Sequence, residues 1–152
     1  MSSLNNRISI YTDGGSRGNP GPAAAAYWIG DLDTGEVLYH GSQFLGVATN
    51  NQAEYQALIN ALEWLLGSDL AVKASELKLY SDSLLMVNQI NRLYRVKDLK
   101  IVSLFSKVNQ LISELKVISK SISINTQHIP RSLNSYADSL VNMALDSNLI
   151  TG

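Results

Sequence analysis

Alternating apolar and polar positions predict three strands in the first third of the chain. Residues 7–13 place Ile8 and Ile10 on one face, among β-branched and aromatic neighbours. A run of small apolar residues over 23–30 predicts a second strand, and residues 36–45 a third. The Asp- and Gly-containing stretch 31–35 has the composition of a hairpin turn, so we expect the second and third strands to be antiparallel.

After residue 49 the spacing becomes helical. Thr49 and Gln52 form a capping-box pattern, apolar residues then recur every three to four positions, and Gly67 marks the expected end. Similar reasoning predicts a short strand over 76–82, a short helix over 83–90 that Ser83 begins, and an amphipathic helix over 101–115. It also predicts a strand over 121–128 and a last helix over 135–144 that Asn134 or Ser135 begins.

The predicted order is β-β-β-α-β-α-α-β-α. A meander followed by strands that alternate with helices indicates an α/β fold, with a mixed five-stranded sheet and helices packed on it. We find no internal repeat, low-complexity tract or linker, so the chain is expected to be one domain over residues 1–152, with a core over about 7–146.

The composition of the chain excludes several classes of protein and site. The 152 residues include no cysteine, which excludes disulfides and thiolate metal sites. No apolar run is long enough to cross a membrane, and the first residues lack the pattern of a signal peptide. We therefore expect a soluble, cytoplasmic protein without a membrane partner.

The charge balance, with 12 basic and 13 acidic residues, argues weakly against a partner with a phosphate backbone. The balance changes if four carboxylates are sequestered around bound cations. Twelve basic residues would then face nine acidic ones, and the placement of charge would matter more than its sum.

Four acidic residues are placed where they could meet. Asp13 and Asp82 are expected to end the first and fourth strands, and such strand ends line the usual crevice of an α/β sheet if the strands pair. Glu54 lies early in the first long helix, and Asp138 near the start of the last. Carboxylates gathered in this way need counter-cations, and oxygen ligands select Mg²⁺ or Mn²⁺. Two such ions about 3.5–4 Å apart suit the hydrolysis of a phosphodiester.

Simpler interpretations stay open for each residue taken alone. An Asp at a strand end or helix start is often a cap or turn residue, and Glu54 alone would be an ordinary solvated helix residue. The Gly- and Pro-rich stretch 14–22 would suit a tight turn or a loop that holds a phosphate. Neither the P-loop nor the dinucleotide-binding motif occurs, so a nucleotide loop is weakly supported.

Four segments follow one another along the chain. They are Tyr11-Thr12-Asp13-Gly14-Gly15-Ser16 with Gly18-Asn19-Pro20-Gly21-Pro22, Thr49-Asn50-Asn51-Gln52-Ala53-Glu54-Tyr55, Tyr80-Ser81-Asp82-Ser83, and His128-Ile129-Pro130-Arg131 through Asn134 to Asp138. In order and spacing they resemble the motifs of type 1 ribonuclease H, and the fourth has the family's ten-residue step from His128 to Asp138. The similarity spans about residues 8–145.

The resemblance implies the ribonuclease H fold and cleavage of the RNA strand of RNA–DNA hybrids with two Mg²⁺ or Mn²⁺ ions, which leaves 5′-phosphate and 3′-hydroxyl ends. It implies that the metal ligands are Asp13, Glu54, Asp82 and Asp138. His128 resembles the family's mobile histidine, which releases product or shuttles a proton, although a strand-end residue bonded to a loop is the alternative. Arg131 could share that work. We expect a monomer whose partner is the hybrid.

The same comparison suggests substrate contacts. Side-chain amides can bond RNA 2′-hydroxyls, and glycines let a nucleic-acid backbone approach closely. Thr49 resembles a residue that binds a phosphate of the DNA strand, and this role is compatible with helix capping. The expected substrate-binding residues are Gly14, Gly15, Asn19, Thr49, Asn50, Asn51, Gln52 and Arg131.

The chain departs from the family pattern in three ways. Leu84 replaces a frequent Gln, and Gln127 replaces the common Gly before the histidine. The long basic protrusion of some members is absent, and the local basic cluster consists only of Arg92, Arg95, Lys97 and Lys100. The departures at Leu84 and Gln127 leave room for a related nuclease that also cleaves double-stranded RNA. A catalytically inactive hybrid-binding module is the other alternative, and the presence of all four carboxylates counts against it.

Overall fold

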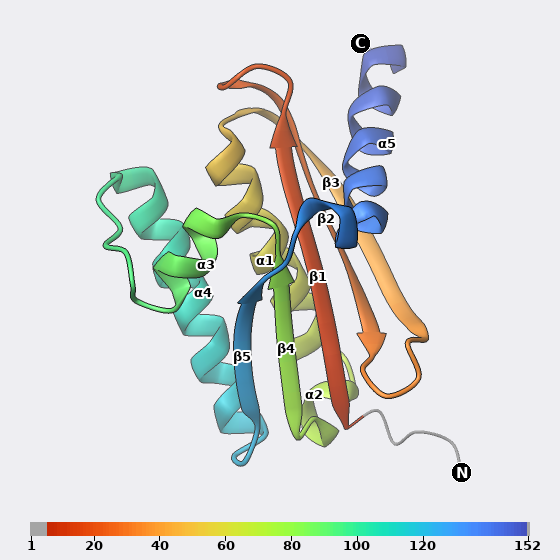
Figure 1. Cartoon of the computed structure of the whole chain (residues 1–152), viewed down its shortest axis with the longest axis vertical. Coiled ribbons are helices and arrows are strands. Elements are labelled where there is room, and N and C mark those ends of the chain that lie inside the picture. Colours follow the sequence, from red (N-terminus) through yellow and green to blue (C-terminus); the bar gives the residue numbers. More distant parts are fainter. Residues whose placement is uncertain (1–5, 152) are drawn as a thin grey trace.

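A computed structural model describes residues 6–151, with side chains described to residue 148. The predicted domain limits of 1–152 extend beyond this range, and the single domain stays a prediction. The described strands form one sheet in the order β3-β2-β1-β4-β5 (Figure 1). Their bounds are β1 (Arg7–Ser16), β2 (Gly21–Asp31), β3 (Val37–Ala48), β4 (Glu76–Ser81) and β5 (Ser123–His128). The first three pair antiparallel, whereas β4 is parallel to β1 and to β5, which confirms the predicted mixed sheet.

Helices cover both faces of this sheet (Figure 1). They are α1 (Asn50–Leu66), α2 (Leu70–Lys73), α3 (Leu84–Ile90), α4 (Leu99–Ile118), the 3-10 turn η1 (Arg131–Leu133) and α5 (Ser135–Thr151). The four residues of α2 were not predicted, since so short a helix shows no periodicity, and α5 is longer than expected. None of the helices between residues 6 and 151 has the length and hydropathy of a membrane span.

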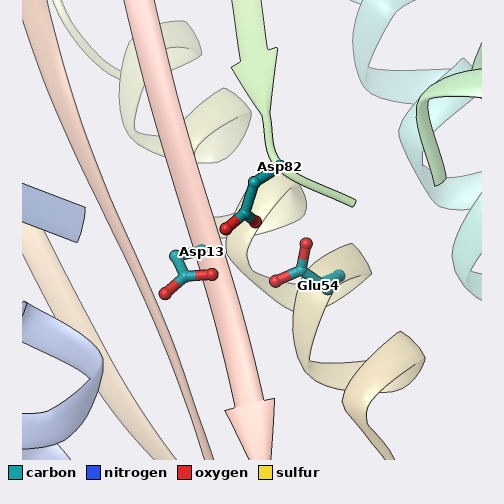
Figure 2. A group of neighbouring side chains, drawn as sticks. All are labelled: Asp13, Glu54 and Asp82. Atoms are coloured by element: carbon teal, nitrogen blue, oxygen red, sulfur yellow. The ribbon is translucent and has the colours of Figure 1, made fainter. Parts of the chain in front are cut away.

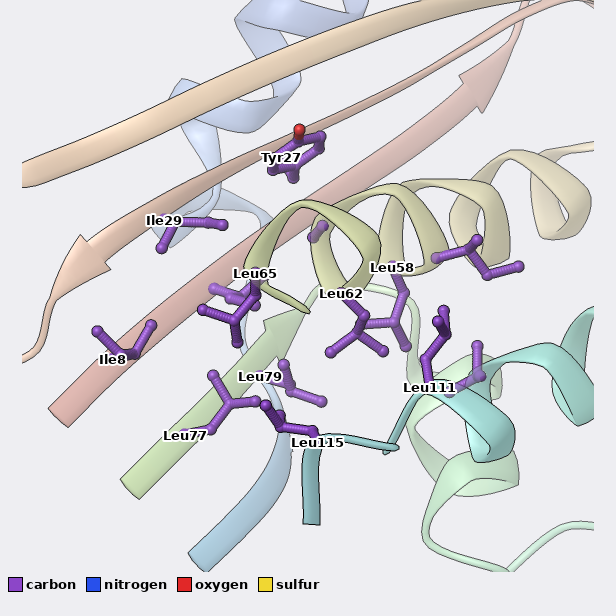
Figure 3. Packing of buried hydrophobic residues seen from close by; sticks show 14 of the residues in the cluster. Ile8, Tyr27, Ile29, Leu58, Leu62, Leu65, Leu77, Leu79, Leu111 and Leu115 are labelled. Carbon is purple, nitrogen blue, oxygen red and sulfur yellow. The ribbon is translucent and has the colours of Figure 1, made fainter. Parts of the chain in front are cut away.

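The main core lies between the sheet and the pair α1 and α4. Alternate residues of the parallel strands, such as Ile8, Leu77 and Leu79, meet the apolar faces of these helices (Figure 3). Leu62 of α1 is 1% exposed at the centre of this core. Truncating a buried leucine to alanine lowers the free energy of unfolding by about 2–5 kcal/mol, so the apolar face of α1 is a major source of stability.

A smaller core holds α5 on the opposite face. Ala24 and Ala26 of β2 are fully buried beneath Val141 and Leu145 of α5. Their small side chains let the helix lie close to the sheet. The strand alternation puts Asp13, which pairs with Ala26, on this same face, while Ile10 and Thr12 point towards α1.

The prediction that the first strand ends at Asp13 is wrong. β1 continues to Ser16 because its pairing with β2 persists to the Ser16–Ala23 pair, whereas its pairing with β4 ends at Thr12 and Ser81. The turn is therefore limited to residues 17–20. Asp13 lies in the body of β1, level with the end of β4, where the edge of β1 facing β4 is open.

Gly14 has a packing role that its sequence pattern did not indicate. A Cβ atom at this position would lie well under 3.0 Å from the backbone of Ala53 and Glu54, so α1 packs directly on the backbone of β1. Gly15 differs, because a Cβ there would meet only Val141, at an ordinary 3.9 Å. The space at Gly14 that was expected to admit a nucleic acid is occupied on that side by α1.

Candidate active site

Three of the four predicted carboxylates meet where β4 ends. Asp13 of β1, Glu54 of α1 and Asp82, the residue after β4, each contribute an oxygen to a group within 4.8 Å (Figure 2). Asp13 and Glu54 are each only 6% exposed. The parallel pairing of β1 with β4 produces this meeting, as expected from the sequence.

Glu54 is held from two sides. The backbone N–H of Gly14 donates to Glu54 Oε1, and the Ser81 hydroxyl donates to Oε2 at 3.3 Å. Ser81 in turn accepts a hydrogen bond from the N–H of Ser83 at 3.0 Å. Because β4 ends at Ser81, Glu54 takes the place of a strand partner for the Gly14 amide. The end of β4 thus lets a helix residue reach the strand backbone.

The group holds more negative charge than its surroundings balance. Burial, and next the charge of Asp82, raise the pKa of Asp13 from 3.8 to about 7. Burial also raises the pKa of Glu54 well above its ordinary value, with further contributions from Asp13 and Asp82. Arg131 Nε lies 3.9 Å from Asp82 Oδ2, but the Arg131 side chain is 84% exposed and contributes little screening. Clustered oxygens with an excess of negative charge fit a hard divalent cation.

Asp138 lies at the margin of the group. It is the fourth residue of α5 and, as predicted, faces Asp13. The charge of Asp138 and a hydrogen bond between the two side chains raise the pKa of Asp13. It is not among the residues whose oxygens all lie within 4.8 Å. The amide of Asn142 donates to its carbonyl oxygen at 3.1 Å and lies 3.5 Å from Oδ2. The fourth carboxylate is therefore close to Asp13 but outside the central three.

An open cavity of about 350 Å³ lies over the carboxylates. Its lining residues are Asp13, Gly14, Asn50, Glu54, Asp82, Ser83 and Arg131. The other predicted substrate residues, Gly15, Asn19, Thr49, Asn51 and Gln52, do not line it, and neither does His128. His128 is exposed at the end of β5, opposite Ser81 of β4. The roles predicted for these residues stay predictions.

Two of the predicted amide contacts join α1 to the end of β1 and to the turn that follows it. The Oδ1 atom of Asn50 accepts from the N–H of Ser16 at 2.9 Å, and the N–H of Asn50 donates to Asn19 Oδ1 at 3.0 Å. Both side chains use their carbonyl oxygens within the protein. Their amide nitrogens are the groups suited to donate to a substrate.

Thr49 and Gln52 form the predicted capping box. Thr49 Oγ1 accepts from the N–H of Gln52 at 3.1 Å, and Gln52 Oε1 accepts from the N–H of Thr49 at 2.8 Å. The capping role of Thr49 is confirmed, and its hydroxyl hydrogen is still able to donate to a phosphate. Asn51 Oδ1 is buried without a hydrogen-bond partner in the described part of the chain.

Sequence patterns missed the support of the site by Ser81 and Ser83. Both residues lie in the third motif, but only Asp82 attracted attention because carboxylates are recognised ligands. The available signal was strand alternation, which places Ser81 on the same face as Leu77 and Leu79, towards α1. A buried hydroxyl there needs a partner, and Glu54 is the residue of α1 within reach.

Fold and site together define a class: α/β domains whose clustered carboxylates suit divalent metal ions. The ribonuclease H (RNase H) family model matches residues 5–146, nearly the whole chain. The chain belongs to the ribonuclease H family.

Curated relatives agree with this assignment. Ribonuclease HI of Halobacterium salinarum is 37% identical over 140 residues, covering 92% of this chain and 65% of that protein. The bifunctional protein Rv2228c of Mycobacterium tuberculosis is 40% identical over 145 residues, covering 93% of this chain and 36% of that protein. The chain thus spans about a third of the length of the first curated relatives that it matches.

Solved structures extend the similarity to three dimensions. LC11-RNase H1, isolated from compost by a metagenomic approach, is 41% identical with a TM-score of 0.84, covering 95% of this chain and 99% of that one. The same protein in complex with an RNA/DNA hybrid is 40% identical with a TM-score of 0.83, covering 94% and 99%.

Proposed function

We propose that this protein hydrolyses the RNA strand of RNA–DNA hybrids with two divalent ions, Mg²⁺ or Mn²⁺. The observation that carries the proposal is the group of oxygens from Asp13, Glu54 and Asp82 within 4.8 Å, beneath an open cavity of about 350 Å³. Further support comes from LC11-RNase H1, a close relative whose structure includes an RNA/DNA hybrid.

The residues that would hold the metal are Asp13, Glu54, Asp82 and Asp138. Asp13 is the best candidate for a ligand shared by both ions, because it interacts with all three of the other carboxylates, Glu54, Asp82 and Asp138. When bound, such ions lower the pKa of a water molecule and neutralise charge on the phosphate and the leaving oxygen.

The protein's own groups would prepare this chemistry. The Gly14 amide and the Ser81 hydroxyl orient Glu54 before substrate arrives. Arg131, beside Asp82, offers a cation to a phosphate oxygen. His128 is an exposed group suited to carry a proton at product release. A water oxygen would bond to phosphorus while the bond to the 3′ oxygen breaks and that oxygen takes up a proton, which leaves a 5′-phosphate and a 3′-hydroxyl.

Substrate choice would depend on sugars and backbone rather than on base sequence. The amide nitrogens of Asn19 and Asn50 can donate to RNA 2′-hydroxyls, which DNA lacks. Thr49 can donate to a phosphate of the DNA strand while it caps α1. Hydrogen bonds of this kind read an RNA–DNA hybrid without reading its sequence.

The decisive test compares Asp13→Asn with the unaltered protein on an RNA–DNA hybrid in Mg²⁺. We expect the loss of activity to exceed the roughly 10–100-fold cost of a lost outer-sphere partner, since Asp13 contacts the metal itself. Asp69→Asn is the matched control, because Asp69 is exposed and its side chain makes no capping hydrogen bond. Retained cleavage by Asp13→Asn would refute the site assignment.

Parallel assays on hybrid, duplex RNA and duplex DNA separate the alternatives. Cleavage of the hybrid alone supports the proposal. Comparable cleavage of duplex RNA identifies a broader nuclease. Hybrid binding without cleavage in either Mg²⁺ or Mn²⁺ identifies an inactive binding module.

A further inference from the structure

We propose that Asn134 is a positioning residue that sets the approach of Asp138 to the three central carboxylates. This inference rests on the proposed function, because it assigns Asp138 to the metal site. Asn134 lies between η1 and α5, directly before the helix that carries Asp138. It is 1% exposed, does not itself line the cavity, and is not one of the three residues that contribute the clustered oxygens.

Three hydrogen bonds join Asn134 to the site. Its Nδ2 donates to the carbonyl oxygen of Thr12 at 2.8 Å, and Thr12 immediately precedes Asp13 in β1. Its backbone N–H donates to the carbonyl of Arg131 at 3.0 Å. Its carbonyl accepts from the N–H of Asp138 at 3.0 Å. One residue thus connects the backbone beside Asp13 with that of Arg131 and Asp138.

The side-chain oxygen of Asn134 indicates that this residue does more than fill space in the core. Oδ1 is buried and has no hydrogen-bond partner in the described part of the chain. An unpaired buried acceptor lowers stability, so an apolar side chain would serve packing better. The bond from Nδ2 to Thr12 is the compensating feature, and it fixes the first turn of α5 against β1.

Other contacts hold the remainder of α5, so the effect of Asn134 should be local. Val141 and Leu145 pack on the small residues of β2, and Arg17 bonds Asp146 at 2.7 Å further along the helix. Without the Asn134 amide, these contacts keep the helix docked while its first turn loosens. Asp138 would then occupy its position beside Asp13 for a smaller fraction of the time.

The test is a double-mutant cycle of Asn134→Ala and Asp138→Asn. Two quantities are measured in each variant: the Mn²⁺ dependence of the melting temperature without substrate, and the Mg²⁺ concentration that gives half-maximal cleavage. We expect each single variant to need about 10-fold more metal in both assays. The double variant should need no more than Asp138→Asn alone, because Asn134 acts through Asp138.

The control is Asn148→Ala, which removes an amide that donates to the Ala144 carbonyl within the same helix at 2.9 Å. It should leave both metal dependences unchanged. Asn134→Asp preserves the size of the side chain but sets a carboxylate oxygen against the Thr12 carbonyl. It should reproduce Asn134→Ala, and it replaces that variant if the alanine protein does not fold.

Three results would overturn the proposal. They are unchanged metal dependence in the Asn134 variants, additive effects in the double variant, and a lower melting temperature with normal metal response. Normal Mn²⁺ binding by the unaltered protein without cleavage of hybrid would instead refute the proposed function. The Mn²⁺ cycle would still decide the role of Asn134.

Discussion

Asp13 is buried among other acids, so its protonation depends on the folded structure. Burial and the charge of Asp82 raise its pKa to about 7. The folded protein therefore holds this proton more tightly than the unfolded chain, in which the pKa is near 3.8. The resulting stabilisation is complete below about pH 4 and is lost as the pH rises through about 7. A divalent ion would supply the missing compensation at higher pH.

Asp13→Asn should therefore stabilise the metal-free protein at high pH. Its free energy of unfolding, relative to that of the unaltered protein, should increase by on the order of 2–4 kcal/mol between about pH 4 and pH 8. Urea unfolding in a chelator measures this difference, and saturating Mg²⁺ should reduce it. A difference that does not change with pH would show that Asp13 titrates normally.

At the scale of single residues, the sequence predicted the clustered carboxylates better than the residues that support them. Asp13, Glu54 and Asp82 were identifiable because carboxylates near strand ends and helix starts have a known chemistry. The roles of Ser81 and Asn134 depend on hydrogen bonds across the fold; Asn134 and Thr12 are separated by 122 residues. No local pattern encodes such a bond, so it emerges only when the elements are assembled.

The contact between α1 and β1 is the closest approach of two elements at the site. It brings the backbone of Ala53 and Glu54 against Gly14 and delivers the Glu54 carboxylate to the Gly14 amide. Because backbone occupies this space, a side chain at Gly14 cannot be accommodated by a change of rotamer. Helix and strand would have to separate.

Gly14→Ala should consequently lower both stability and activity. We expect the free energy of unfolding to decrease by at least about 3 kcal/mol, at the upper end of the cost of overpacking. Gly15→Ala is the control, since its new Cβ would meet only Val141, at 3.9 Å. Its free energy of unfolding should lie within about 1 kcal/mol of that of the unaltered protein. Urea unfolding measures both variants. Equal stability of the two would contradict the packing role of Gly14.

At the scale of elements, periodicity predicted the long helices and the succession of strands along the chain. It failed at the end of β1, where Gly14 and Gly15 suggested a turn. Glycines do favour turns, but here pairing with β2 continues through them to Ser16. The reason for Gly14 lies in a helix some 40 residues further along the chain, where local composition gives no information about it.

Across the whole molecule, charge placement matters more than the net charge of −1. The predicted basic cluster of Arg92, Arg95, Lys97 and Lys100 lies between α3 and the start of α4, and all four residues are exposed. Arg92 and Arg95 also line an open cavity of about 610 Å³ beside Tyr94 and Phe105. Exposed cations within one segment are suited to meet the phosphates of a long duplex.

Arg92→Gln together with Arg95→Gln should weaken hybrid binding with little effect on the chemical step. If each arginine contacts one phosphate, the slope of log affinity against log salt should decrease by up to about 2. Binding of a hybrid in Ca²⁺ at several salt concentrations measures the slope, and kcat should stay within about twofold. Lys73→Gln, beyond this cluster at the end of α2, is the control. An unchanged slope would identify the cluster as ordinary solvated surface.

The four carboxylates are separated by long stretches of sequence, and the last belongs to α5, the final helix of the described chain. During synthesis, the sheet and α1 can assemble while Asp138 is still inside the ribosome. A growing chain would therefore hold an incomplete metal site until α5 docks beside Asp13. Under the proposed function, cleavage of hybrids would reach its full rate only after α5 has docked.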